Sequence, residues 1–578
     1  MTRPDQTRPD QTRPDQTRPC FCSCIYDYLV DWLRSEEVFI FWMTASSFVF
    51  CGINFRNFGK GLLFALRDTL TFGRNIAIVF YAVILSDVIL YVFLRKFKLL
   101  HRIAKFILLA VNVCMFVVNI FTIYKFGILF NSKMLRVATS TNFRETREFI
   151  AAYLLDIDLW LFFAAIFLAL CAARYVFSVL RRYKTLMLII VTIGTITGAA
   201  SVIREQTIPF NKLLARCTNS IGLYRLRNML KASYGADIGY NKILEKIPEN
   251  IHLTKNESTI PFVVFIFGES TNRNHMQIYG YKFDNTQELL KLKDEGRLYV
   301  FDDVISPHGL TQASLQKVFT FLNYEASGKW YEHITLFSIL SKAGYYTVWL
   351  SHQDSTIETR LYSGQCSYYD STVAVTYDES ILPLLDKALT QEHEKNFYLL
   401  HIEGTHMMYY NRYPSKYNIY SPEQETGSSY KVKFRRATYD NAVYYNDFVV
   451  REIIRRFEDK NAIVIYISDH GEEVHDTINF MGHNDGMSSS HIIEIPMLIW
   501  LSQKFSESYP ELEQRIAASI HRPYMTDDMI HTVLDIMSIE TDEYDPSRSI
   551  INPLFNSSRP RIYSGQVYNK ETGLHALP

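Results

Sequence analysis

Long apolar segments are concentrated in the first third of this 578-residue chain. A helix of about 20 residues is needed to cross the hydrocarbon core of a bilayer. Buried core helices are the alternative interpretation, but so many of them would leave a globular domain little polar surface. The pattern therefore predicts five transmembrane helices, over residues 38–55, 75–94, 106–124, 157–176 and 185–203.

Basic residues crowd the loops that follow the second and fourth of these segments, at positions 95–105 and 181–184. Lys and Arg are enriched in the cytoplasmic loops of membrane proteins. This bias places the amino terminus in the cytoplasm and everything after residue 203 outside it. The first external loop also carries basic residues, which weakens the bias without reversing it.

The chain divides into four regions on these grounds. Residues 1–35 begin with tandem copies of Thr-Arg-Pro-Asp-Gln and predict a disordered cytoplasmic tail that lacks the features of a cleaved signal peptide. Residues 36–203 hold the five predicted spans. Residues 204–254 mix apolar and basic positions, which fits a helix on the membrane surface or an ordinary linker helix equally well. Residues 255–578 are long enough for one large outer domain.

Cysteine usage and charge exclude two classes for the outer region. Only Cys217 and Cys366 follow the last predicted span, so a disulfide-stapled domain is not predicted. The formal net charge of the chain is zero, and the outer region has no long basic run. Nucleic acid is therefore not an expected partner.

The outer region alternates strand-like and helix-like patterns. Its apolar, β-branched runs at 260–266 and 462–467 are typical of strands buried on both faces of a sheet that helices cover. Further strands are predicted over 345–350, 397–402 and 496–501. The order indicates an α/β fold with a mostly parallel sheet sandwiched by helices.

Polar residues follow the two most apolar of these strands. Glu269 comes directly after the first, and Asp469 and His470 come directly after the second. The carboxyl ends of parallel strands meet at one edge of a sheet, which is where open α/β sheets bind ligands. Two carboxylates beside an imidazole are a ligand set suited to Zn²⁺, although Glu269 or Asp469 could instead cap a following helix.

These motifs belong to a longer series that resembles the membrane-bound phosphoethanolamine transferases of Gram-negative bacteria, in the alkaline phosphatase and sulfatase superfamily. That family also places five spans before an alkaline-phosphatase-like outer domain. The matching blocks are Gly268-Glu269-Ser270 with Arg273, Tyr279-Gly280-Tyr281, Gly309-Leu310-Thr311, His401 to His406, Tyr409 to Pro414, Tyr439-Asp440-Asn441, Ser468 to Glu472, Gly482-His483-Asn484 and Ile495 to Trp500.

The resemblance implies a role for six residues. Glu269, Thr311, Asp469 and His470 would hold Zn²⁺, and Thr311 would also be the nucleophile. Coordination to zinc lowers the pKa of a threonine hydroxyl, which is otherwise a poor nucleophile. His406 and His483 would contact the transferred phosphoryl group or a second metal.

Other residues near these positions keep alternative assignments open. Ser306 and Ser314 are alternative nucleophiles, because both lie close to Thr311 in the sequence. The remaining histidines that we consider, as structural residues or supports of the site, are His275, His308, His352, His401 and His475.

The resemblance also implies an activity. Phosphoethanolamine would pass from phosphatidylethanolamine, through a phosphothreonine-type covalent intermediate, to an envelope acceptor. The enzyme would be a multi-pass protein of the bacterial inner membrane with its catalytic domain in the periplasm. The branch that modifies lipid A has several disulfides and a Cys-Gly-Thr motif, whereas this chain has Gly309-Leu310-Thr311. It is therefore more similar to the branch that acts on lipopolysaccharide core sugars or other acceptors.

Three alternatives remain open from the sequence. One is a phosphoglycerol transferase of the lipoteichoic-acid synthase type, which shares the five-span layout and the zinc-bound threonine. Another is a membrane-anchored phosphodiesterase or sulfatase, although no Cys/Ser-x-Pro-x-Arg motif occurs near Thr311. The third is an inactive envelope scaffold that retains the fold, and bound zinc would argue against it.

Overall fold

The computed structural model describes residues 96–126, 129–140, 143–180, 222–231, 251–353, 357–372, 377–391 and 393–576, with isolated positions before residue 95. The chain divides into two compact units. One comprises residues 1–121 and 160–229, and the other comprises residues 122–159 and 230–578. The second unit contains the α/β fold, and it includes the segment 122–159, which lies between two of the predicted spans.

Two helices of the structure are long and apolar enough to cross a membrane. Helix α3 spans Lys98–Phe126 and helix α6 spans Ile157–Leu180. They contain the third and fourth predicted spans. The tail 1–35, most of the other three predicted spans and most of the linker 204–254 lie outside the described residues. Within the linker, residues 222–231 are helical, and a strand begins at Leu253.

A seven-stranded sheet forms the centre of the α/β fold. Its spatial order is β3-β11-β8-β2-β7-β5-β6, and β11 runs antiparallel to both of its neighbours while the other pairs are parallel. The prediction of a mostly parallel sheet is confirmed, with β11 making it mixed. The strands are β2 Phe262–Gly268, β3 Leu298–Phe301, β5 Tyr346–Ser351, β6 Tyr368–Ser371, β7 Asn396–His401, β8 Ala462–Ser468 and β11 Met497–Leu501.

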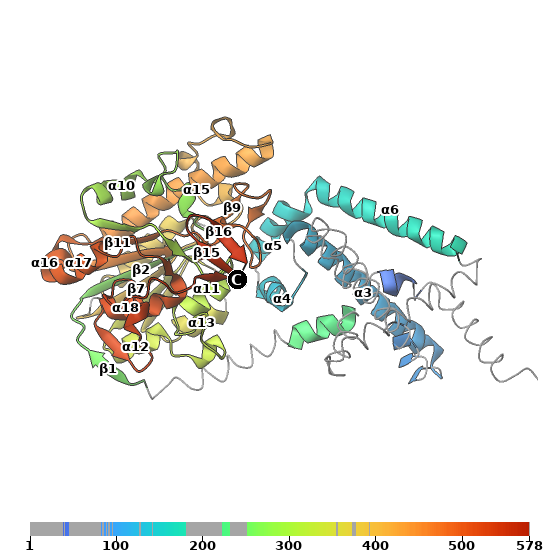
Figure 1. The fold of residues 1–578 in the computed structure, drawn as a ribbon, viewed down its shortest axis with the longest axis horizontal. Coiled ribbons are helices and arrows are strands. Elements are labelled where there is room, and N and C mark those ends of the chain that lie inside the picture. Colours follow the sequence, from blue (N-terminus) through green and yellow to red (C-terminus); the bar gives the residue numbers. More distant parts are fainter. Residues whose placement is uncertain are drawn as a thin grey trace, which may run out of the picture. The chain divides into compact units, whose positions relative to one another are not determined.

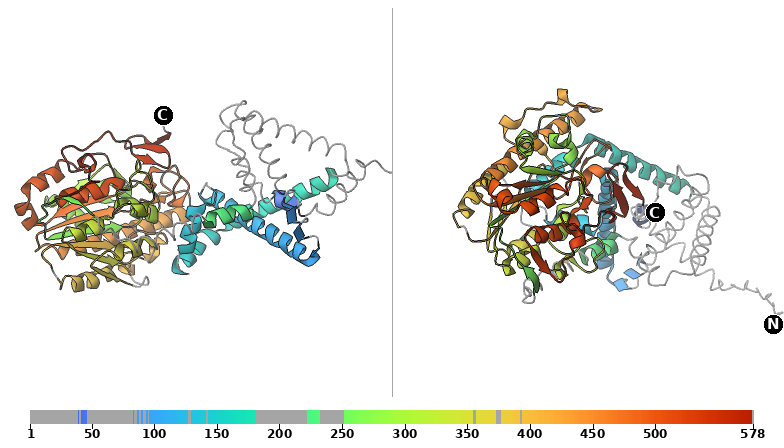
Figure 2. Two further views of the ribbon diagram at one scale, coloured as in Figure 1. Left: turned by 90° about the horizontal axis from the view of Figure 1, so that it is seen from below. Right: turned by 60° about the vertical axis from the view of Figure 1, so that its left-hand side comes forward.

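Helices cover both faces of this sheet, as Figure 1 shows. Alternate residues of β2 point to opposite faces, so Val263 and Phe265 pack into one apolar core and Val264 and Ile266 into the other. The first core is closed by α11 Thr311–Val318, α12 Leu336–Lys342, α13 Ile357–Ser363, α16 Gln503–Ser508, α17 Pro510–Ala517 and α18 Met529–Ile536. The second core is closed by α10 Gln287–Asp294, α14 Ile381–Ala388 and α15 Tyr430–Arg455. Figure 2 shows the same layers from two further directions.

Short strands and helices surround these layers. Four smaller sheets pair β1 Leu253–Asn256 with β13 Ile539–Thr541, β4 Val304–Ile305 with β12 Tyr524–Met525, β9 Glu473–Val474 with β10 Met481–Gly482, and β14 Ile562–Tyr563 with β15 Gln566–Asn569 and β16 Gly573–Ala576. The segment between α3 and α6 forms α4 Ser132–Ser140, α5 Phe143–Phe149 and a π-helical turn, η3, over Ile150–Leu154.

The register of the central strands positions the loops of interest. Gly268 at the end of β2 lies opposite Ser468 at the end of β8, so the residues that follow them emerge side by side. Phe267 lies opposite His401 of β7 in the same way. The predicted meeting of Glu269 and Asp469 at one sheet edge is therefore observed.

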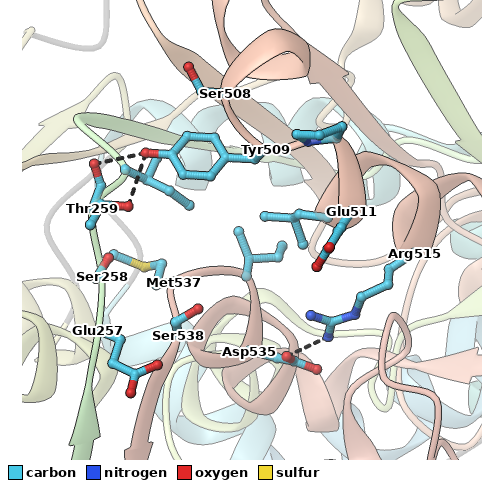
Figure 3. Close-up of a pocket in the computed structure, with 14 residues that line it drawn as sticks. Glu257, Ser258, Thr259, Ser508, Tyr509, Glu511, Arg515, Asp535, Met537 and Ser538 are labelled. Atoms are coloured by element: carbon cyan, nitrogen blue, oxygen red, sulfur yellow. Dashed lines mark hydrogen bonds and ion pairs between the residues drawn. The ribbon is translucent and has the colours of Figure 1, made fainter.

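The opposite edge of the sheet carries a groove of about 440 Å³ (Figure 3). Two of its polar side chains have partners within the wall. Arg515 donates to Asp535 at 2.5 Å, and the Tyr509 hydroxyl donates to the Thr259 carbonyl at 2.9 Å. Residues 257–260, which precede β2, line this groove. It therefore lies at the opposite end of β2 from the loop that carries Glu269.

Candidate active site

Four of the predicted site residues meet at the carboxyl edge of β2 and β8. The Thr311 hydroxyl lies 3.0 and 3.1 Å from the two oxygens of Glu269 and 3.3 Å from Nε2 of His470. Nε2 of His470 also lies 3.2 Å from Oε1 of Glu269 and 3.2 Å from Oδ2 of Asp469. Their ligand atoms therefore converge on one small volume, and Glu269, Asp469 and His470 have the spacing of a metal-binding group.

Hydrogen bonds around this cluster leave its inward-facing atoms available. Nδ1 of His470 lies 2.8 Å from the Gly471 carbonyl, so this nitrogen carries a proton and Nε2 can offer a lone pair. Oδ1 of Asp469 accepts from the backbone N–H groups of Ser270 and His470, while its buried Oδ2 accepts no hydrogen bond from the described residues. A buried oxygen without a donor beside an imidazole and a second carboxylate fits a divalent cation such as Zn²⁺.

The electrostatics of the cluster favour a positive charge at this position. Burial and the neighbouring Glu269 raise the pKa of Asp469 well above its usual value. Burial opposes a charge on His470, but the nearby Asp469 and Glu269 raise its pKa to about 10. The two carboxylates thus attract a proton to the ring in the absence of a metal, and a bound cation would replace that proton.

The structure separates the three hydroxyls that the sequence offers as nucleophiles. Ser306 and Ser314 are fully buried, and both donate to the backbone carbonyl of Asp469, at 2.5 and 2.7 Å. They brace the loop after β8. Thr311, at the first turn of α11, is the one of the three whose hydroxyl contacts the carboxylates and imidazole of the cluster.

His406 and His483 lie next to this cluster. The His483 ring is centred 4.0 Å from the His470 ring and 6.1 Å from the His406 ring. Glu269, His406 and His483 also have the spacing of a metal-binding group. Burial lowers the pKa of His406 to about 4, so its ring is neutral near pH 7. Two imidazoles beside a hydroxyl and two carboxylates can donate hydrogen bonds to a phosphoryl oxygen.

Glu472 and Tyr409 support His483, a role that the sequence analysis did not assign. Nδ1 of His483 lies 2.6 Å from Oε2 of Glu472, and Oε1 of the same carboxylate accepts from the Tyr409 hydroxyl at 2.6 Å. A carboxylate at Nδ1 fixes the tautomer and orientation of an imidazole. Both residues belong to blocks that carry the family resemblance, but only the folded chain shows what they contact.

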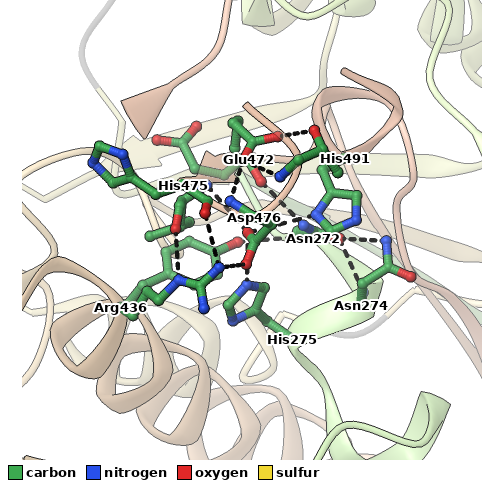
Figure 4. Close-up of polar contacts among 12 residues, drawn as sticks. Asn272, Asn274, His275, Arg436, Glu472, His475, Asp476 and His491 are labelled. Carbon is green, nitrogen blue, oxygen red and sulfur yellow. Dashed lines mark hydrogen bonds and ion pairs between the residues drawn. The ribbon is translucent and has the colours of Figure 1, made fainter. Parts of the chain in front are cut away.

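A second polar network lies beside the loop after β8 (Figure 4). His275 is fully enclosed between two carboxylates, with Nδ1 2.7 Å from Asp440 and Nε2 3.0 Å from Asp476. Arg436 donates to Asp476 at 2.5 Å, and Asn272 donates to the Glu472 carbonyl at 3.0 Å. The network therefore anchors residues 472–476, from which Glu472 reaches His483.

The other histidines considered from the sequence have structural surroundings. His401 is buried, and burial lowers its pKa to about 4. His308 pairs with Asp485 at 3.0 Å, and His352 lies 3.0 Å from the Ser380 hydroxyl. His475 lies beside the guanidinium of Arg435 at 3.0 Å. None of these four is in the metal-binding groups found among the described residues.

Comparison with known proteins defines the class. Residues 261–539 match the sulfatase family. The C-terminal periplasmic domain of EptC from Escherichia coli superposes with a TM-score of 0.51 at 30% identity, covering 57% of this chain and 96% of that domain, and it has also been solved in complex with Zn. The outer region is therefore a sulfatase-family domain with an α/β fold.

Sequence relatives place the chain within that class. Phosphoethanolamine transferase EptC of Escherichia coli K12 is 32% identical over 328 residues, and phosphoethanolamine transferase CptA of Salmonella typhimurium is 31% identical over 327 residues. Each match covers 53% of this chain and 56% of the relative, so the chain matches about half the length of these relatives. The chain belongs to the phosphoethanolamine transferase family, as the motif series predicts.

The likeness in fold extends to an integral membrane protein. Lipooligosaccharide phosphoethanolamine transferase A (EptA) of Neisseria meningitidis, an integral membrane protein, superposes with a TM-score of 0.59 over 89% of this chain and 98% of that chain. The two are 20% identical, so this likeness concerns the fold alone.

Proposed function

We propose that this protein transfers phosphoethanolamine from phosphatidylethanolamine to an acceptor in the bacterial envelope. The acceptor class is a lipopolysaccharide core sugar or lipid A, or another periplasmic glycan or protein. The observation that carries the proposal is the Thr311 hydroxyl, held 3.0 Å from Glu269 and 3.3 Å from His470 at the carboxyl edge of the sheet.

Zn²⁺ is the proposed metal, held by Glu269, Thr311, Asp469 and His470. Bound there, it would lower the pKa of the Thr311 hydroxyl and offset negative charge on the phosphoryl oxygens. The support is the donor set, three oxygens and one nitrogen, together with the buried Asp469 oxygen that has no donor among the described residues. The EptC periplasmic domain in complex with Zn supports the choice of metal.

The chain's own residues perform two displacements at phosphorus. Thr311 Oγ1 transfers its proton to Glu269 and forms a bond to phosphorus while the bond to the diacylglycerol oxygen breaks. The leaving oxygen takes a proton from a neighbouring imidazole, for which His483 is placed by Glu472. An acceptor hydroxyl then loses its proton to that imidazole and bonds to phosphorus. The bond between phosphorus and Thr311 Oγ1 breaks, and this oxygen takes back its proton from Glu269. His406 and His483 bind phosphoryl oxygens in both steps.

We place the protein in the inner membrane, as a multi-pass protein with its α/β domain in the periplasm. Helices α3 and α6 have the length and hydropathy for this. A catalytic domain tethered at a bilayer meets a lipid donor at a far higher effective concentration than a free domain does. This gives the membrane helices a role in the reaction that we propose.

The test is mass spectrometry of the full-length protein after incubation with phosphatidylethanolamine or, in parallel, phosphatidylglycerol. We expect a phosphoethanolamine adduct on the peptide that contains Thr311, and no adduct in Thr311→Val or after zinc chelation. Ser314→Ala is the matched control, because that hydroxyl contacts a backbone carbonyl, and it should keep the adduct. An adduct formed only from phosphatidylglycerol would instead show a phosphoglycerol transferase. No adduct from either lipid would favour a hydrolase or an inactive scaffold.

A further inference from the structure

The segment between α3 and α6 contacts both loops that carry the histidines beside the metal-binding cluster. It forms α4, α5 and the turn η3, and it belongs to the same compact unit as the α/β fold. Two of its side chains are buried against that fold: Glu148 is 7% exposed and Tyr153 is 5% exposed. Each of them reaches a different histidine loop.

Glu148 is linked to the loop that carries His406. Its carboxylate accepts from Nη2 of Arg412 at 2.6 Å and from the Asn411 side chain at 3.3 Å. Nη1 of Arg412, whose side chain is almost completely buried, also pairs with Glu403. The backbone N–H of His406 donates to the Glu403 carbonyl at 3.3 Å. A buried chain of charges therefore runs from the segment to the residues on both sides of His406.

Tyr153 is linked to β10, the strand that ends directly before His483. Its hydroxyl donates to the Met481 carbonyl at 3.3 Å, two residues before His483. Gly482 has a φ of +121°, and a Cβ added there would lie 2.7 Å from the Tyr153 hydroxyl oxygen, so the two groups are in close contact. Phe126, at the end of α3, packs against both Tyr153 and Phe480, with ring centroids 5.4 and 6.1 Å apart.

The local helix geometry explains how one short segment makes both contacts. Residues five apart lie on different faces of a regular α-helix, because each turn takes 3.6 residues. Here the backbone N–H of Leu155 bonds to the carbonyl of Ile150, five residues earlier, so the turn is widened. An i→i+5 turn of this kind is rare and is often found at functional sites. Glu148 lies just before this wide turn and Tyr153 lies within it, and both side chains reach the α/β fold.

We propose that Glu148 and Tyr153 are positioning residues for the transfer reaction, which hold His406 and His483 at the distance needed to bind the transferred phosphoryl group. This inference rests on the proposed function. The two histidine rings are 6.1 Å apart and lie on separate loops, and both loops contact the segment 143–154. In the sequence, this segment is followed by α6, which begins at Ile157.

The test compares Glu148→Gln and Tyr153→Phe with Glu571→Gln and Tyr369→Phe in the full-length protein in lipid nanodiscs. Glu148→Gln removes only a charge and Tyr153→Phe removes only a hydroxyl. The two control variants make the same changes at exposed residues. Hydrogen exchange should rise at least fivefold in residues 403–412 for Glu148→Gln and in residues 480–485 for Tyr153→Phe. Zinc content should stay at the wild-type value in all four variants.

The kinetic test separates positioning from a purely structural role. We expect the rate constant for formation of the Thr311 adduct at saturating lipid to fall at least tenfold in both variants. The concentration of lipid donor that gives half this rate should stay within threefold of wild type. Glu148→Asp, which restores the charge, should recover part of the loss. Unchanged hydrogen exchange in both loops, or a rate constant for adduct formation within twofold of wild type, would overturn the inference. If phosphatidylethanolamine is not the donor, the wild-type protein will form no adduct with it. The hydrogen-exchange measurement would still test whether Glu148 and Tyr153 position the two loops.

Discussion

Replacing His275 should destabilise the α/β domain in a pH-dependent way. The ring is 2% exposed and lies between Asp440 and Asp476, at 2.7 and 3.0 Å. Burial alone would lower the pKa of His275, but the two carboxylates raise it to about 10. The ring is therefore a buried cation. His275→Asn would leave Asp440 without its cation, whereas Asp476 would keep its ion pair with Arg436.

Two arguments give a similar magnitude for this loss. Removing one partner of a buried ion pair costs about 3–5 kcal/mol, because the remaining charge stays buried without its partner. A rise in the pKa from 6.5 to about 10 corresponds to about 5 kcal/mol of stabilisation of the protonated form. For a large domain each kcal/mol shifts Tm by about 2 °C, so His275→Asn should lower Tm by about 6–10 °C near pH 6.

The sign of the pH dependence follows from the raised pKa. The folded protein binds the proton more tightly than the unfolded chain, so the stabilisation is complete below about pH 6.5 and declines as pH rises toward 10. The decline should be about 1.4 kcal/mol per pH unit between these limits. The gap in Tm between wild type and His275→Asn should therefore be widest at pH 6 and become narrow by pH 10.

Thermal unfolding of the full-length protein in detergent, measured at several pH values between 6 and 10, provides the assay. His521→Asn is the matched control, because His521 also pairs with an aspartate but its side chain is 79% exposed. Exposed ion pairs contribute little, so this variant should unfold within about 1 °C of wild type. A gap for His275→Asn that stays constant from pH 6 to 10, or that is below 2 °C at pH 6, would refute the buried-cation assignment.

Two further predictions concern the metal site and the loop after β8. Asp469→Asn should abolish tight zinc binding, measured by metal analysis. It should also remove the stabilisation of about 4 kcal/mol that wild type gains when free zinc exceeds Kd about a thousandfold. Equal zinc content in both proteins would contradict the assignment of Asp469 as a ligand. Gly471→Ala should destabilise the domain by about 1–3 kcal/mol and lower its zinc content, because the added Cβ would lie 2.1 Å from the His491 carbonyl oxygen; a wild-type Tm and metal content in this variant would show that the loop can move aside.

Local patterns in the sequence account for much of the fold. The uninterrupted apolar runs of β2 and β8 predict strands buried on both faces, and both strands end where the polar residues begin. The position of Glu269 and of Asp469 at one edge follows from that alone, because parallel strands end together. The third and fourth apolar segments likewise coincide with α3 and α6. These features depend on residues that are near one another in the chain.

The direction of β11 could not be predicted from its sequence. Its residues Met497–Leu501 are as buried as those of β2, and burial on both faces is independent of strand direction. The antiparallel pairing with β8 and β3 is decided by how the intervening chain returns to the sheet.

The selection of one hydroxyl and the support of the histidines depend on contacts between distant residues. In the sequence, Ser306 and Ser314 remain alternatives to Thr311 as the nucleophile. The packing of α11 against the loop after β8 directs the two serines to a carbonyl and Thr311 to the carboxylates. Tyr153 meets Met481 across 328 residues of chain. The sequence alone therefore determined the buried strands and the residues that follow them, because a run of apolar residues that are adjacent in the chain is enough to indicate a buried strand. Only the tertiary structure decided which side chains share one volume, because that depends on strand register and on segments far apart in the chain.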